Sequence, residues 1–184
     1  MRAKNVIALV VFVLTAFSSA EVADSEAGGF TVKITAQIQA PPADVYSRLV
    51  HNVGDWWNPA HTFSGDARNL SIDDRPLGCF CEKLSGGGGA RHMEVIFAAP
   101  GKLLRMSGGL GPLQGMATAA TMTFALKSAG EGTSIELTYT VVGYSTQGMA
   151  ALATPVNSVL TEQITRLKNY IETGKPGAVE PPKK

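Results

Sequence analysis

The sequence has little cysteine, no cluster of basic residues and no phosphate-binding loop, and each absence removes a class of function. Its two cysteines, Cys79 and Cys81, are one residue apart, unlike the C-x-x-C of redox enzymes or the two pairs of a zinc site. The formal net charge is +1 and the basic residues are scattered, so nucleic acid is not an expected partner. No Lys-Ser or Lys-Thr follows the glycines at 86–89, and no cofactor is implied.

Only one long apolar run is present, and it lies at the amino terminus. Arg2 and Lys4 precede apolar residues 6–17, and the small residues Ser18-Ser19-Ala20 follow, a pattern typical of a secretory signal. The run is shorter than the roughly 20 residues of a spanning helix, so we expect no stable membrane insertion and a periplasmic or secreted protein. The predicted parts are a signal at 1–20, a domain at 30–173 and a flexible tail at 174–184.

Most of the domain is predicted to be antiparallel sheet. In "FTVKITAQIQ", residues 30–39, apolar and polar residues alternate, which predicts a half-buried strand. Pro41-Pro42 then favours a helix that ends near Gly54, and a short helical turn follows. Six further short segments separated by turn residues are predicted as strands: 69–73, 79–84, 91–99, 103–107, 117–129 and 133–143.

A long amphipathic helix is predicted at the carboxyl end of the domain. It has an apolar stripe, interrupted by Gln163, and Gly174 is the expected stop. Because proline is unfavourable inside a helix, either Thr154 caps a helix that begins at Pro155, or an earlier turn is kinked there. The stripe consists of Val156, Val159, Leu160, Ile164, Leu167 and Ile171.

Four segments resemble the START-like superfamily, also called SRPBCC, in what would be an exported member. They are "ITAQIQAPPADVYSRL", "LGCFCEKL", "HMEVIFAAPGKLLRM" and "MTFALKSAGEGTSIELTYTVVGY". The superfamily includes polyketide cyclases, lipid-transfer domains and chaperone-activator homologues. The resemblance implies an α+β helix-grip fold: a curved antiparallel sheet of about seven strands wrapped around a long C-terminal helix, with two short helices after the first strand.

The resemblance also implies a cavity between sheet and helix that binds a hydrophobic or amphipathic small molecule. Methionine suits a cavity wall that adapts to its ligand, and one of the adjacent tryptophans is expected to close the mouth while the other lies in the core. The predicted ligand-binding residues are Trp56, Trp57, Met93, Val95, Phe97, Met116, Met122, Phe124, Tyr144, Val156 and Leu160.

The stretch "GCFCEKLSGGGGARHME" predicts a hairpin with reactive side chains. In a regular strand, residues i and i+2 are about 6.5 to 7 Å apart at Cα, so Cys79 and Cys81 are either reduced or lie in a distorted strand. The two cysteines with His92 or Glu94 are weak candidates for a metal site.

The register of this hairpin separates two interpretations. Alternation places Met93, Val95 and Phe97 toward the cavity and His92 on the outer face. In one register the cysteines face inward; in the other Glu82 does.

An inward Glu82 would favour a second function, a cofactor-independent cyclase or isomerase. Glu82 would be its acid or base, with a raised pKa, and His61 or His92 would assist. A third possibility, a protein-interaction module like the chaperone activators, is disfavoured by the predicted export.

Overall fold

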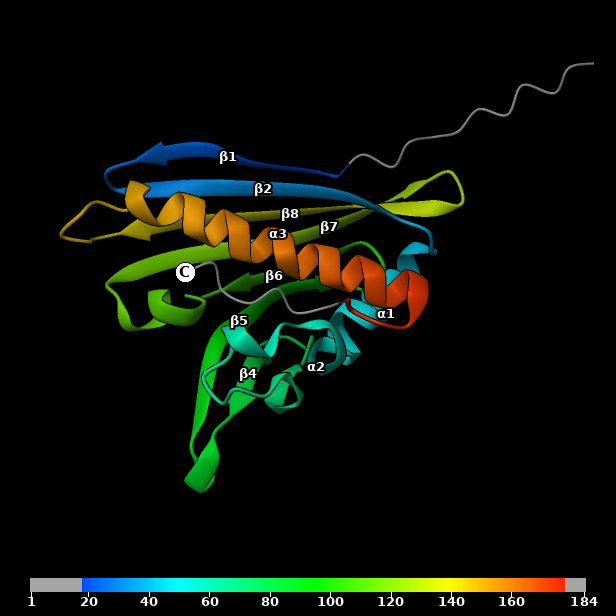
Figure 1. The fold of residues 1–184 in the computed structure, drawn as a ribbon, viewed down its shortest axis with the longest axis horizontal. Helices are drawn as coiled ribbons and strands as arrows, with labels where there is room; N and C mark the ends of the chain where they lie inside the picture. The colour runs from blue at the N-terminus through cyan, green and yellow to red at the C-terminus, as the bar shows by residue number, and fades with distance from the viewer. Residues whose placement is uncertain (1–17, 178–184) are drawn as a thin grey trace, which may run out of the picture.

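The computed structural model describes residues 18–177, which form one curved antiparallel sheet with a long helix across one face (Figure 1). The spatial order of the strands is β1-β2-β8-β7-β6-β5-β4-β3. The strands are β1 (Ser19–Glu26), β2 (Gly29–Ile38), β3 (Leu70–Ile72), β4 (Cys79–Lys83), β5 (Gly89–Ala99), β6 (Leu103–Ser107), β7 (Thr118–Ala129) and β8 (Gly132–Gly143). The helices are α1 (Pro42–His51), α2 (Val53–Trp56) and α3 (Ala150–Thr173), with short 3-10 turns η1 (Pro59–His61), η2 (Ala67–Asn69), η3 (Ser85–Gly87) and η4 (Gly111–Gly115).

The core lies between the inner face of the sheet and α3. Every second residue of β2 is buried, from Phe30 to Ile38, because the apolar residues alternate along the strand. The neighbouring β8 and β7 repeat this alternation, and Tyr139 of β8 is fully buried. Figure 1 shows α3 running along this face, with β4 and β5 continuing beyond it at the far side of the sheet. Among residues 18–177, no helix is long and apolar enough to cross a membrane.

Helix α3 ends at the predicted position. It begins at Ala150, before Pro155, where one of the two predicted alternatives had placed its start. Gly174 adopts the left-handed conformation, with φ 76°, and its N–H bonds to the carbonyl of Tyr170. Pro155 lies inside the helix, so the residues before it form an earlier turn and Thr154 is not the cap. The unexpected polar residue of its stripe, Gln163, is buried and accepts the backbone N–H of Asn58 at 2.8 Å.

The seven predicted strands are present, and an eighth, β1, was not predicted. It is an edge strand whose residues are exposed except for the half-buried Val22, so it has no apolar alternation to mark it. Its first two residues, Ser19 and Ala20, belong to the predicted signal. Residues 1–17 of that signal, and 178–184 of the predicted tail, lie outside the described residues.

Candidate functional site

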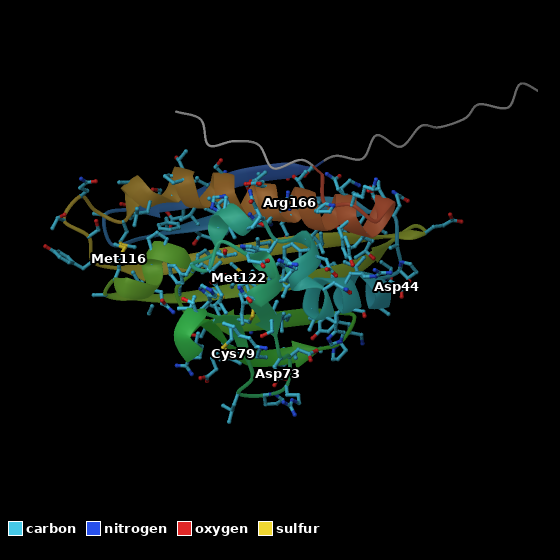
Figure 2. All side chains as sticks on the ribbon, turned by 60° about the horizontal axis from the view of Figure 1, so that its bottom comes forward. Asp44, Asp73, Cys79, Met116, Met122 and Arg166 are labelled. Atoms are coloured by element: carbon cyan, nitrogen blue, oxygen red, sulfur yellow. A yellow bond between two sulfur atoms is a disulfide. The ribbon has the colours of Figure 1, made fainter. Side chains whose placement is uncertain are left out.

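A cavity of about 390 Å³ lies between the inner face of the sheet and α3. Its wall combines the α2-to-η1 segment, the strands β3, β4, β5 and β8, the η4 loop and the first half of α3. Figure 2 shows Met116, from the η4 loop, near the beginning of α3, and Cys79 on the β4 side of the sheet. The side chains of the wall are mainly apolar, and the polar ones are His61, Thr62, His92 and Tyr139.

His92, a residue of this wall, is hydrogen-bonded to the buried carboxylate of Glu82 behind it. The Nε2 of His92 lies 2.9 Å from Oε2 of Glu82, and the two residues are 5% and 2% exposed. The carboxylate also accepts the backbone N–H groups of Phe63, at 3.1 Å, and Ser64, at 2.5 Å. Glu82 therefore connects the loop after η1 to the β5 strand, and it fixes the orientation of the His92 ring.

Both members of the pair face inward because β5 contains a bulge at His92. Cys79 and Phe80 pair with Glu94 and Met93, whereas Cys81 pairs with Arg91, so His92 is the extra residue. His92 and its neighbour Met93 are consequently both buried, although alternation predicted His92 on the outer face. The prediction for His92 is wrong, because Cys79 and Phe80 pair in one of the two predicted registers and the residues from Cys81 onward pair in the other.

Glu82 is an ionised carboxylate rather than an acid. Burial of the carboxyl raises its pKa, but the hydrogen bonds from Ser64, Phe63 and the His92 ring together lower it below the usual value. The raised pKa expected from the sequence is therefore wrong. Since an ionised carboxylate only accepts hydrogen bonds, we assign a proton to Nε2 of His92.

The two tryptophans have different surroundings, as their adjacency predicts. Trp56 is core and donates its Nε1–H to the carbonyl of Arg48, while Trp57 lines the cavity and donates to the carbonyl of His61. The Trp57 ring meets Phe80 edge to face, with centroids 5.4 Å apart.

A second histidine and carboxylate lie on the α3 side of the cavity. Nε2 of His61 is 3.2 Å from Oε2 of Glu162, and the other oxygen of Glu162 accepts from Asn58 Nδ2. Arg166, further along α3, donates to the carbonyl of Trp56 at 2.9 Å, and burial lowers the pKa of its guanidinium. Helix α3 thereby holds the loop that carries His61.

Tyr139 joins the floor of the cavity to the η4 loop. Its hydroxyl accepts the N–H of Leu110 at 3.1 Å and donates to the carbonyl of Gly108 at 3.3 Å. Burial raises its pKa to about 12, against a smaller lowering by the Leu110 hydrogen bond. Only glycine fits at 108, since a Cβ there would lie 2.5 Å from the carbonyl oxygen of His92.

The two cysteines form a disulfide on the outer side of β4. Their Cα atoms are 5.4 Å apart, closer than in a regular strand, so the alternative of a distorted strand holds and neither cysteine is free. A disulfide sulfur is not a thiolate ligand, and among residues 18–177 no group of three or more His, Cys, Asp or Glu is placed to hold a metal ion.

Four of the predicted ligand-binding residues line the cavity: Trp57, Met116, Val156 and Leu160. Five are buried in the core without lining it: Trp56, Met93, Val95, Met122 and Phe124. Phe97 is 51% exposed because a second bulge, after Val95, turns it outward, and Tyr144 is 70% exposed after the end of β8. The expectation that these two face the cavity is wrong.

Several wall residues were missed by the sequence analysis, among them Phe63, Leu113 and Tyr139. Tyr139 had a signal, since it shares the apolar face of the predicted strand 133–143. Phe63 and Leu113 lie in loops, where no periodicity marks the inner face.

A curved antiparallel sheet around a long C-terminal helix, with a cavity between them, is the helix-grip arrangement. No protein-family model matches the sequence, and no curated protein matches it. Solved structures match the fold. A conserved protein of unknown function, EF2215 from Enterococcus faecalis, has a TM-score of 0.60 at 16% identity, over 89% of this chain and 82% of that one.

Two further structures resemble the chain. For CalU16 from Micromonospora echinospora the TM-score is 0.54 at 19% identity, over 89% of this chain and 88% of that one. For Aha1 from Colwellia psychrerythraea, solved as a dimer, the TM-score is 0.55 at 19% identity, over 79% of this chain and 98% of that one. At such identities the likeness concerns the fold, and it confirms the START-like, or SRPBCC, fold predicted from the sequence.

Proposed function

We propose that this protein binds a hydrophobic or amphipathic small molecule in the cavity between the sheet and α3, in the periplasm or outside the cell. The observation that carries the proposal is an apolar cavity of about 390 Å³ whose wall includes a buried histidine, His92, held by the Glu82 carboxylate behind it. Small-molecule sites are typically apolar concavities of this size with a few polar groups that fix orientation.

Two observations support the export. One is the charged and apolar amino-terminal pattern of residues 1–20. The other is the disulfide between Cys79 and Cys81, since disulfides persist mainly in oxidising compartments.

The binding function is tested by titration with the apolar dye N-phenyl-1-naphthylamine and by native mass spectrometry of protein purified from its own host. We expect saturable dye binding, competed by whatever apolar compound organic solvent extracts from the protein. Val156→Trp, which places an indole in the cavity, should weaken dye binding at least tenfold. Tyr144→Ala, at an exposed aromatic outside the cavity, is the matched control and should bind as the unaltered protein does. Equal binding by the two variants would contradict the proposal.

A second function, cofactor-independent proton transfer of the cyclase or isomerase kind, is favoured by the Glu82–His92 pair itself. Glu82 accepts three hydrogen bonds as a carboxylate, so its role would be to orient the ring, and His92 would be the base. Deuterium uptake from solvent at the α-carbon of a bound ketone, lost in His92→Phe, would support catalysis. Binding of the ketone without deuterium uptake would support binding as the function and not catalysis.

A further inference from the structure

The side-chain hydrogen-bond donors of the cavity wall are all occupied within the protein. The Tyr139 hydroxyl donates to Gly108, and the Thr62 hydroxyl donates to the carbonyl of Pro59 at 2.8 Å. The two imidazoles each direct Nε2 at a carboxylate, Glu162 for His61 and Glu82 for His92. A ligand that needed a donor from these side chains would therefore have to break an existing bond.

One buried side-chain acceptor of the wall is left without a partner. Nδ1 of His92 is buried and has no hydrogen-bond partner. The Glu82 carboxylate favours the tautomer with the proton on Nε2, and in that tautomer Nδ1 presents a lone pair. A buried polar atom without a partner is unfavourable, and a ligand with a suitable group would recover that free energy.

The wall also lacks a partner for a charged ligand. Among the described residues that line the cavity, none is Lys, Arg, Asp or Glu. A carboxylate or phosphate inside it would be desolvated without a cation to compensate, and the lone pair at Nδ1 would repel it. The wall therefore offers a ligand a hydrogen-bond acceptor without a charge.

We infer that the ligand is an apolar alcohol or phenol whose hydroxyl group donates a hydrogen bond to Nδ1 of His92. This inference rests on the proposed binding function and specifies the chemistry of the ligand. Because Nδ1 is itself buried, a neighbouring side chain must move to admit the hydroxyl. Phe63 is placed to do so: it stacks on the His92 ring with centroids 5.4 Å apart, lines the cavity and is half exposed.

The test compares three probes of similar size, 2-naphthol, 2-methoxynaphthalene and 2-naphthoate, by calorimetric titration at pH 7.5. In the unaltered protein 2-naphthol should bind about 3- to 10-fold more tightly than 2-methoxynaphthalene, the range expected for one hydrogen bond. The 2-naphthoate anion should bind more weakly than either. In His92→Phe the preference for the hydroxyl should disappear while 2-methoxynaphthalene still binds, which shows that the cavity is intact. His51→Phe, at an exposed histidine on α1, is the control and should keep the preference.

Each outcome decides one of the two claims. If 2-naphthol and 2-methoxynaphthalene bind equally, or 2-naphthoate binds most tightly, the inference about the hydroxyl is overturned and the binding function stands. If the preference survives in His92→Phe, the hydroxyl is recognised elsewhere and the inference is likewise overturned. If none of the three binds, the proposed function fails together with the inference.

Discussion

The Cα atoms of Cys79 and Cys81 lie 5.4 Å apart, and the segment of β5 that pairs with them, from Arg91 to Glu94, contains one residue more than theirs. The disulfide shortens β4 opposite the place where β5 is bulged. The extra residue is His92, so a covalent bond on the outer side of the sheet lies across from the bulge that turns this histidine into the cavity.

Removal of the disulfide should therefore loosen the site. In the double variant Cys79→Ser with Cys81→Ser, we expect unfolding free energy to fall by about 1 to 2 kcal/mol, as the chain-entropy relation gives for so short a loop. We also expect N-phenyl-1-naphthylamine to bind several-fold more weakly, because β4 can extend and the bulge can shift. Urea denaturation, dye titration and the nitrogen NMR signals of the His92 ring measure these changes. Unchanged ring signals and affinity would show that the bulge does not depend on the disulfide.

Glu82→Gln should lower the unfolding free energy much more than Glu94→Gln, the same change on the outer face of the sheet. The substitution removes the charge that accepts from Phe63, Ser64 and His92, and we expect a loss of about 2 to 3 kcal/mol in unfolding free energy. The control is Glu94→Gln, whose carboxylate pairs with the exposed Arg91 and should cost less than about 1 kcal/mol. Urea denaturation at pH 7 compares the two variants, and similar losses would contradict the structural role assigned to Glu82.

The same carboxylate should make stability depend on acid pH. The pKa of Glu82 is lower in the folded protein than in the unfolded chain, where the pKa of glutamate is about 4.3. The unfolded chain then binds the proton more readily, so the stabilisation is present above that pH and is lost as the pH falls through the folded-state value. Thermal unfolding between pH 6 and pH 3 should show a smaller fall in Tm for Glu82→Gln than for the unaltered protein. Parallel curves would contradict the lowered pKa.

Tyr139→Phe should release the η4 loop from the sheet. The change removes the acceptor for Leu110 and the donor to Gly108, at an expected cost of about 1 kcal/mol per bond. Amide hydrogen exchange at Leu110 should become faster, and dye affinity should fall because Leu110 and Leu113 line the cavity. Tyr144→Phe, at an exposed position, should change neither measurement. Unaltered exchange at Leu110 would show that the loop is held by other contacts.

The loops of the site explain why its wall was only partly predictable. Val156 and Leu160 were identified because they repeat along a helix. One of the two adjacent tryptophans was expected at the cavity because neighbours cannot face the same way, and the structure shows that it is Trp57. Phe97 was misplaced because the bulge after Val95 reverses the alternation, and no local pattern marks that bulge. The partners of the two histidines, Glu82 and Glu162, come from distant segments.

The sequence by itself determined the order of the strands and of the long helix from β2 to α3, the inner faces of β2, β7 and β8, and the end of α3 at Gly174. These features depend on side-chain periodicity and on local backbone preference, which a single segment contains. Only the tertiary structure decided that Glu82 meets His92 at the cavity wall and that Cys79 bonds to Cys81. Those relationships depend on a one-residue shift between two strands, and such a shift is fixed by the packing of the whole sheet against α3 rather than by either strand alone.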